Sequence, residues 1–382
     1  MGEIISAQLA AEALIDRGVE YVFTLSGGHI TPIYQHLENS PVKMFDTRHE
    51  QAAVFMAEAY GRMTKKPGVA MVTAGPGFTN ALSAVMNAKL ANAPLLLIAG
   101  CVGIESTEKL DLQDMYQLPV IEPIVKKAFV CQTPERVYEY VDMAYRTAMS
   151  GRPGPVYLEL PVDILNKKVK DENCKRPHTI IDSHPVDLLK SQKIIEMMEE
   201  AEKPIIIAGS GTWYSGASDK LIKFVENTGV PALTSSLGRG TIPDTHPLCF
   251  ESSLVIRPGA AFSANMGADL VILLGTRVSL YYLFGDIFKK DAKIIHIDIE
   301  PGEIGRNRTI DLPVVSDVAE ILKVCNGIIE ERGIAGRLQE RFKSWVESLK
   351  KEEETVKAQS RQNWTSENVP IHPMRLMKEI ND

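Results

Sequence analysis

Short apolar runs alternate with amphipathic helical stretches along this chain, and this alternation constrains the fold more than any other feature. The runs show little polar alternation, which is typical of strands covered by helices on both faces. Strands separated by helices favour a parallel α/β sheet. In the first part of the chain we predict strands at residues 21–25, 43–47, 68–75, 93–100 and 155–161.

A second α/β pattern follows a change in composition. Residues 167–187 are polar and rich in turn-forming residues, so we expect a linker there. We therefore predict two domains, 1–166 and 188–335, each a mostly parallel sheet covered by helices, followed by a charged helix and the start of a new element at 336–382. The strands of the second domain are predicted at 203–211, 230–236, 268–275 and 292–301, with a short strand and a helix within 312–333.

Composition excludes several classes of protein. The five cysteines are scattered without a CxxC spacing, which argues against a disulfide framework and a zinc site. A net charge of -7 without a basic cluster argues against nucleic acid as a partner. No apolar run reaches the roughly 18 residues of a membrane span. The first residues lack the features of a signal peptide, so we expect the protein to be located in the cytoplasm.

Glu50 lies where a short apolar strand passes into a helix whose buried face is almost wholly apolar. The helix dipole favours a carboxylate in the first turn, so an ordinary role at a helix start accounts for Glu50 taken alone. A role in chemistry is the alternative. The segment that follows the next strand favours this alternative.

That segment contains a strand-to-helix turn made of Gly75, Pro76 and Gly77. Glycine lets the backbone approach a ligand closely, and small helix residues let helices or subunits pack closely. A plain turn explains the glycines but explains the polar residues after them less well. These polar residues are Thr79, Asn80 and Asn87.

Similarity to a known family rests on five segments, 22–28, 48–62, 72–100, 151–164 and 294–307. Together they resemble the thiamine-diphosphate enzymes of the acetolactate synthase type, a family that includes oxalyl-CoA decarboxylase and 2-hydroxyacyl-CoA lyase. The similarity runs through both predicted domains in order. It implies a first domain that binds the pyrimidine ring of thiamine diphosphate and a Rossmann-like central domain.

The resemblance implies a catalytic role for Glu50. In this family a glutamate at that position hydrogen-bonds a ring nitrogen of the cofactor and promotes loss of the thiazolium C2 proton, and the activated cofactor then decarboxylates a 2-keto acid. Burial among apolar groups favours the protonated form of a carboxyl group, as this role requires. Gly27, Gly28 and the turn segment Gly75, Pro76, Gly77, Thr79, Asn80 and Asn87 are then cofactor-binding candidates.

Two further positions are substrate-side candidates by resemblance. Acetolactate synthases carry a Phe-Gln-Glu triplet followed by a lysine, where this chain has Leu112, Gln113 and Asp114, and then Lys126. Only Gln113 and Lys126 match, so the departures leave the choice of substrate open. A solvated surface lysine is the alternative for Lys126.

The second domain has candidates for an adenine-nucleotide site. Its glycines do not have the GxGxxG spacing of a dinucleotide fold. In the family, however, the matching residues hold FAD, ADP or a CoA-derived adenosine, or nothing. A carboxylate can hold ribose hydroxyls and an arginine a diphosphate, and a βα turn with a structural ion pair is the alternative. The candidates are Gly209, Gly211, Arg277 and Asp298.

A diphosphate-binding domain is expected but not found in the sequence. In the family, this domain binds Mg²⁺ through a Gly-Asp-Gly motif and an asparagine, and residues 1–382 contain no Gly-Asp-Gly. We therefore expect no metal ligands in this chain. The chain would then be a fragment of a longer enzyme, one subunit of a split enzyme or a degenerate relative. The resemblance also implies a homo-oligomer or a partner subunit that supplies the missing domain.

Three functions remain at this point. The first is the pyrimidine-binding and central part of an acetolactate synthase-like enzyme that decarboxylates a 2-keto acid and transfers the acyl group, and whose pathway would be branched-chain amino acid biosynthesis. The second is an enzyme of the 2-hydroxyacyl-CoA lyase or oxalyl-CoA decarboxylase type. The third is a non-catalytic subunit that binds a nucleotide and serves as a scaffold.

Overall fold

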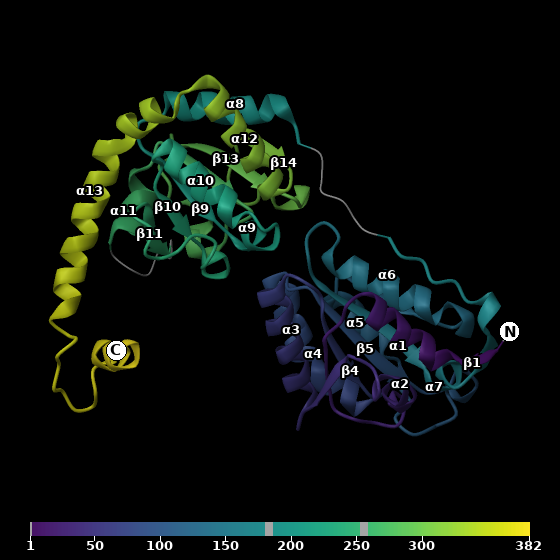
Figure 1. The fold of residues 1–382 in the computed structure, drawn as a ribbon. Coiled ribbons are helices and arrows are strands. Elements are labelled where there is room, and N and C mark those ends of the chain that lie inside the picture. Colours follow the sequence, from purple (N-terminus) through teal and green to yellow (C-terminus); the bar gives the residue numbers. More distant parts are fainter. Residues whose placement is uncertain (1, 180–185, 253–258) are drawn as a thin grey trace. The chain divides into compact units, whose positions relative to one another are not determined.

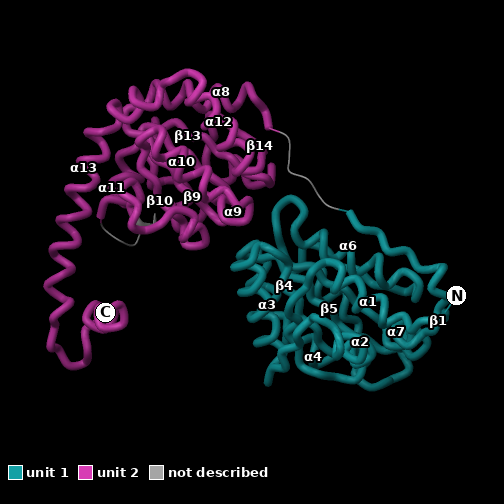
Figure 2. Tube along the Cα trace, in the orientation of Figure 1, with its two compact units in different colours: residues 1–182 teal, residues 183–382 magenta. Residues whose placement is uncertain are grey.

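The computed structural model describes residues 2–179, 186–252 and 259–382, and divides into two compact units, 1–182 and 183–382 (Figure 2). Each unit contains one six-stranded sheet in which every neighbouring pair of strands is parallel. Helices pack against both sheets (Figure 1). The predicted fold class is therefore confirmed.

Unit 1 has the strand order β3-β2-β4-β5-β7-β6. Helices α1, α2 and α6 bury their apolar side chains on one face of this sheet, while α3 and α4 pack against each other and against β4. The strands are β2 (Tyr21–Thr24), β3 (Lys43–Asp46), β4 (Gly68–Val72), β5 (Leu95–Cys101), β6 (Lys127–Val130) and β7 (Pro155–Pro161). The helices are α1 (Ser6–Asp16), α2 (Thr31–Leu37), α3 (Glu50–Thr64), α4 (Pro76–Ala91), α5 (Leu118–Ile121), α6 (Val137–Met149) and α7 (Val162–Leu165).

Unit 2 has the strand order β11-β10-β9-β12-β13-β14. The strands are β9 (Pro204–Ala208), β10 (Ala232–Thr234), β11 (Cys249–Ser252), β12 (Leu270–Leu274), β13 (Lys293–Asp298) and β14 (Leu312–Val315). The helices are α8 (Leu188–Glu200), α9 (Ser210–Tyr214), α10 (Ser218–Thr228), α11 (Ala260–Gly267), α12 (Val318–Arg332), α13 (Ala335–Arg361) and α14 (Pro373–Asn381).

The charged helix predicted after residue 335 is α13, and its first half packs on unit 2. Leu338, Phe342 and Trp345 are buried in the apolar clusters on the two faces of the sheet, and the Trp345 indole donates to the carbonyl of Pro204 at 3.2 Å. This part of α13 therefore contributes to the core of unit 2. None of the described helices is long and apolar enough to span a membrane.

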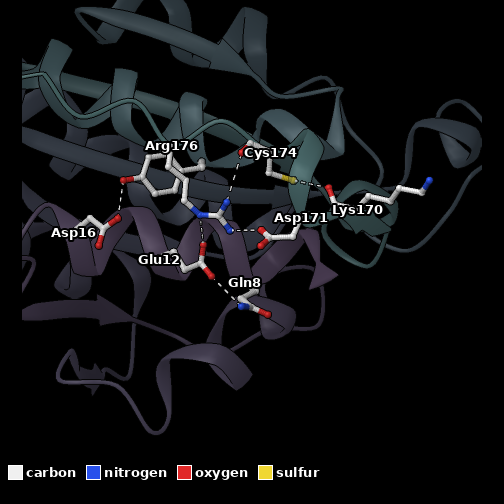
Figure 3. A network of polar contacts seen from close by, with 8 residues as sticks. Gln8, Glu12, Asp16, Lys170, Asp171, Cys174 and Arg176 are labelled. Atoms are coloured by element: carbon white, nitrogen blue, oxygen red, sulfur yellow. Dashed lines mark hydrogen bonds and ion pairs between the residues drawn. The ribbon is translucent and has the colours of Figure 1, made fainter. Parts of the chain in front are cut away.

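The segment predicted as a linker begins with ordered structure. Within it, β8 (Lys168–Lys170) pairs antiparallel with β1 (Glu3–Ile5). The Arg176 guanidinium then binds the carboxylates of Glu12 on α1 at 2.8 Å and Asp171 at 2.7 Å (Figure 3). Residues up to Arg176 are thus attached to unit 1, whereas residues 180–185 of the predicted linker lie outside the described part of the chain.

Candidate functional site

The loops that carry the candidate residues of unit 1 leave the sheet at one edge. Because all its strands are parallel, their carboxyl ends meet at that edge, and the chain order reverses between β2 and β4. Such a reversal leaves a crevice where ligands bind in open α/β sheets. Gly27 and Gly28 follow β2, the 75–77 turn follows β4, and Glu50 begins the helix after β3.

Glu50 is held by a neighbouring helix and has only 7% of its surface exposed. Asn80 on α4 donates its side-chain amide to Oε2 of Glu50 at 2.9 Å. Near the other carboxylate oxygen lies Gly77, where an added Cβ would come within 3.3 Å of Oε1. One oxygen is therefore engaged, whereas the second lies beside Gly77 and the Thr73 side chain, whose Cγ2 would be 2.7 Å from a Cβ at Gly77.

The turn between β4 and α4 needs its glycine. Gly75 has φ 57° and ψ -115°, a conformation that residues with a side chain rarely adopt, and a Cβ there would lie 2.9 Å from the side chain of Gln113. Pro76 follows as the first residue of α4, a position where its missing N–H costs nothing. The exposed Thr79 bonds the Pro76 carbonyl at 3.2 Å.

A second group of polar residues lies between the β2 and β4 loops. A Cβ on Gly27 would overlap the side chain of Thr73, whereas Gly28 has open space around it. The Thr73 hydroxyl lies 3.2 Å from Nδ1 of His29 and 3.5 Å from Oε1 of Gln113. Gln113 is therefore brought to the same edge as the turn.

Two predicted residues of unit 1 lie elsewhere. Asn87 donates to both carboxylate oxygens of Glu58, at 2.9 and 2.7 Å, further along the α3/α4 pair and away from Glu50. Lys126 directly precedes β6 and so lies where the strands begin, away from their carboxyl ends. Its amine donates to the backbone carbonyl of Thr147 at 2.7 Å and to that of Ser150, which follows α6. In this chain neither residue joins the group around Glu50.

In unit 2, Gly209 and Gly211 follow β9 and Arg277 follows β12, at the point where the chain order of that sheet reverses. Gly211 donates its N–H to the carbonyl of Gly275 at 3.0 Å, and side chains on either glycine would collide with that loop. Asp298, buried at the end of the adjacent β13, accepts the N–H of Glu300 at 2.9 Å.

The four nucleotide candidates therefore share the carboxyl edge of the sheet. The glycines are required by close packing of the two loops. In the described residues, no group of three or more His, Cys, Asp or Glu side chains has the arrangement of a metal site.

Sequence reasoning missed several residues at the edge of unit 1, and Gln117 is the most connected of them. Its side chain contacts the N–H of Gly75, the carbonyl of Gly100 and the side chains of Tyr157 and Glu159. Burial and the Glu159 carboxylate raise the pKa of Tyr157 well above its usual value, so the Tyr157 hydroxyl stays a donor to Glu159, at 2.7 Å. A buried glutamine leaves no periodic signal in a sequence.

Comparison with known proteins identifies two domain families in this chain. Residues 6–120 match the family described as "Thiamine pyrophosphate enzyme, N-terminal TPP binding domain", and residues 191–324 match "Thiamine pyrophosphate enzyme, central domain". The matched residues together make up more than half of the chain.

Similar proteins include a probable acetolactate synthase large subunit of Methanococcus aeolicus, 32% identical over 98% of this chain and 63% of that protein. The acetolactate synthase large subunit of Lactococcus lactis is 31% identical over 98% of this chain and 64% of its own length. Oxalyl-CoA decarboxylase of Escherichia coli is 31% identical over 82% and 56%. The chain thus spans less than two thirds of these relatives. It belongs to the thiamine pyrophosphate enzyme family, of which it carries the N-terminal and central domains.

Proposed function

We propose that this chain is the pyrimidine-binding and central part of a thiamine-diphosphate-dependent enzyme that decarboxylates a 2-keto acid and transfers the acyl group, as acetolactate synthases do. The observation that carries the proposal is the environment of Glu50. Its Oε2 is fixed by Asn80, and its Oε1 lies beside Gly77, which has no side chain of its own, and close to the side chain of Thr73. A carboxyl group fixed through one oxygen could hold a ring nitrogen with the other and share a proton with it.

When bound, thiamine diphosphate supplies a carbanion at C2 and an electron sink for the decarboxylation. The residues of this chain would orient it. Glu50 would hold and pass the proton at the pyrimidine ring, and Gly77 and Thr73 would lie beside that contact. Mg²⁺ and the diphosphate would be held by a further domain, provided by a longer chain or a partner subunit. The reaction would take place in the cytoplasm.

A Glu50→Gln substitution tests the proposal in an enzyme complete with its diphosphate-binding domain. Loss of a positioned proton donor costs about 10²- to 10⁴-fold in turnover, so we expect a loss in that range with pyruvate as substrate. Glu58→Gln is the matched control, because Glu58 is a buried carboxylate on the same helix and also accepts from an asparagine. Glu50→Gln with full turnover would support the non-catalytic scaffold instead.

A second candidate reaction is that of oxalyl-CoA decarboxylase or 2-hydroxyacyl-CoA lyase. It is favoured by Leu112 and Asp114, which replace the Phe and Glu of the synthase triplet. Turnover of oxalyl-CoA rather than pyruvate would support it. Mass spectrometry of the small molecules released from the denatured protein would identify the nucleotide proposed for the edge near Arg277 and Asp298. Bound FAD would favour the first reaction, and bound ADP or CoA would favour the second.

A further inference from the structure

Gln117 joins three neighbouring strands of unit 1 through one side chain. It directly precedes α5 and is only 2% exposed. Its Oε1 accepts the N–H of Gly75, which follows β4, at 3.0 Å. Its Nε2 donates to the carbonyl of Gly100 on β5 at 3.1 Å and lies 3.0 Å from the Tyr157 hydroxyl and 3.1 Å from Glu159, both on β7.

These contacts fix the direction of the amide. The N–H of Gly75 can only donate, so the side-chain oxygen must face it, and the carbonyl of Gly100 requires a donor on the other side. Tyr157 donates its hydroxyl to Glu159 and accepts from Gln117, which makes the group fully connected. A buried, satisfied polar network of this kind rigidifies the backbone to which it is attached.

The backbone attached here is the turn beside Glu50. Gly75 is the N-cap of α4, and the first residues of that helix include Gly77, which adjoins Oε1 of Glu50. Asn80, on the first turns of the same helix, holds Oε2. A displacement of Gly75 would therefore move both groups that define the surroundings of the Glu50 carboxylate.

We propose that Gln117 is a positioning residue for Glu50. It clamps the turn at Gly75, so that Gly77 and Asn80 stay in place around the carboxylate. The catalytic part of this inference rests on the proposed function, whereas the clamp itself is a property of the chain alone. The two parts therefore have separate tests.

The clamp is tested by hydrogen–deuterium exchange of the 382-residue chain. Gln117→Met keeps the length of the side chain and removes its hydrogen bonds, so the amide of Gly75 should exchange at least about tenfold faster, the factor that a loss of 1.4 kcal/mol gives. Gln8→Met is the matched control, since Gln8 makes a side-chain hydrogen bond to Glu12 on α1, in the same unit. Unchanged exchange at Gly75 in Gln117→Met would overturn the clamp.

A pH series with Gln117→Glu distinguishes the clamp from simple filling of space. This variant keeps an acceptor for Gly75 but places a second carboxyl group beside Glu159, and two carboxylates at that distance share a proton as the pH falls. At about pH 8 we expect the Gly75 amide of Gln117→Glu to exchange faster than that of the wild-type chain. As the pH is lowered to about 5.5, the ratio of the two exchange rates should fall toward one. A ratio independent of pH would contradict the hydrogen-bonding role. Because Gln117→Glu fills the same space, it also serves if Gln117→Met fails to fold.

The catalytic part is tested in the complete enzyme at saturating thiamine diphosphate. Gln117→Met should lower kcat and the exchange rate of the cofactor C2 proton by the same factor, about tenfold or more, because both depend on Glu50. A change confined to KM for the 2-keto acid would overturn the positioning role. If Glu50→Gln itself retains full turnover, the proposed function fails, while the exchange at Gly75 still reports whether Gln117 clamps the turn.

Discussion

Asn80 and Asn87 lie two turns apart on α4, and each donates to a buried carboxylate of α3. The two pairs differ in what they leave unused. Asn87 bonds both oxygens of Glu58, whereas Asn80 bonds only Oε2 of Glu50. Among the described contacts, Asn80 therefore leaves Oε1 of Glu50 unused, whereas both oxygens of Glu58 are used within the helix pair. This difference is what separates the candidate catalytic residue from a structural one.

Replacement of Asn80 by leucine should destabilise unit 1. The change removes the hydrogen bond to the buried Glu50 side chain, and leaving a buried polar group without its partner costs about 1 to 3 kcal/mol. We expect Asn80→Leu to lower the free energy of unfolding by less when Glu50 is also replaced by leucine, because the carboxyl group that loses its partner is then absent. Urea unfolding followed by far-UV circular dichroism measures the free energy of unfolding of each variant.

Tryptophan fluorescence provides an internal control for this experiment. The three tryptophans, Trp213, Trp345 and Trp364, all lie in unit 2, so their emission follows the unfolding of that unit alone. The fluorescence transition should be the same in wild type and Asn80→Leu. An Asn80→Leu chain whose circular dichroism transition matches that of wild type would show that Glu50 does not depend on Asn80.

At the scale of elements, α3 is placed by a close approach to β4. A Cβ on Gly68, the first residue of β4, would overlap the backbone carbonyl of Ala57 on α3. The carbonyl cannot move without displacing the helix that begins with Glu50. Glycine at this position therefore sets how near α3 lies to the sheet.

The substitution Gly68→Ala should cost about 1 to 3 kcal/mol in unit 1, which is the usual cost of overpacking. Gly327→Ala is the contrasting variant, because Gly327 is exposed within α12 and has open space around it. Alanine there should stabilise unit 2 by about 0.5 to 1 kcal/mol through its higher helix propensity. Circular dichroism measures the effect of Gly68→Ala, and tryptophan fluorescence measures the effect of Gly327→Ala. A Gly68→Ala chain with the free energy of unfolding of wild type would contradict the close approach of α3 to β4.

The sequence predicted the elements whose side chains are buried on both faces. The strands β4, β5, β9 and β12 are fully buried apolar runs, and such runs are recognisable without a structure. The strands β1, β6, β8 and β11 were not predicted. The first three are short and mostly half-buried or exposed, so their residues carry no clear apolar pattern, and β11 is only four residues long.

The candidate site could be predicted only in part. Glu50 and the turn at Gly75 lie together because the carboxyl ends of parallel strands share an edge, and this follows from the fold class. The pairing of Asn87 with Glu58 depends on the rotation of α4 against α3, which a sequence pattern does not specify. The role of Gln117 depends on burial in a loop, where no periodicity applies.

At the scale of the whole molecule, both units place their candidate residues according to the same rule. In each sheet the chain order reverses once, between β2 and β4 and between β9 and β12, and glycine-containing loops leave the sheet there. The loops in unit 1 carry a polar group around Glu50, whereas those in unit 2 pack on each other between Gly211 and Gly275. The shared architecture therefore gives two candidate ligand edges with different chemistry.

The five cysteines allow the opening of both units to be followed in one experiment. Burial raises the pKa of Cys101, that of Cys131 to about 11 and that of Cys325 to about 12, whereas Cys174 and Cys249 are half-buried. A thiol reacts as its thiolate, so these buried thiols stay protonated and inaccessible until the surrounding unit opens. With Ellman's reagent at pH 8, we expect two fast thiols and three that react about 100-fold more slowly, which corresponds to an opening cost of roughly 3 kcal/mol.

Single cysteine substitutions assign the slowly reacting thiols to one unit or the other. Cys131→Ala should remove slow amplitude that belongs to unit 1, and Cys325→Ala should remove amplitude that belongs to unit 2. All five thiols should react quickly in guanidinium chloride, because unfolding restores ordinary thiol pKa values and access. A third fast thiol in the native chain would contradict the packing of whichever unit contains it. If the slow phase resolves into two rates, the two units open independently, as expected for domains with separate cores.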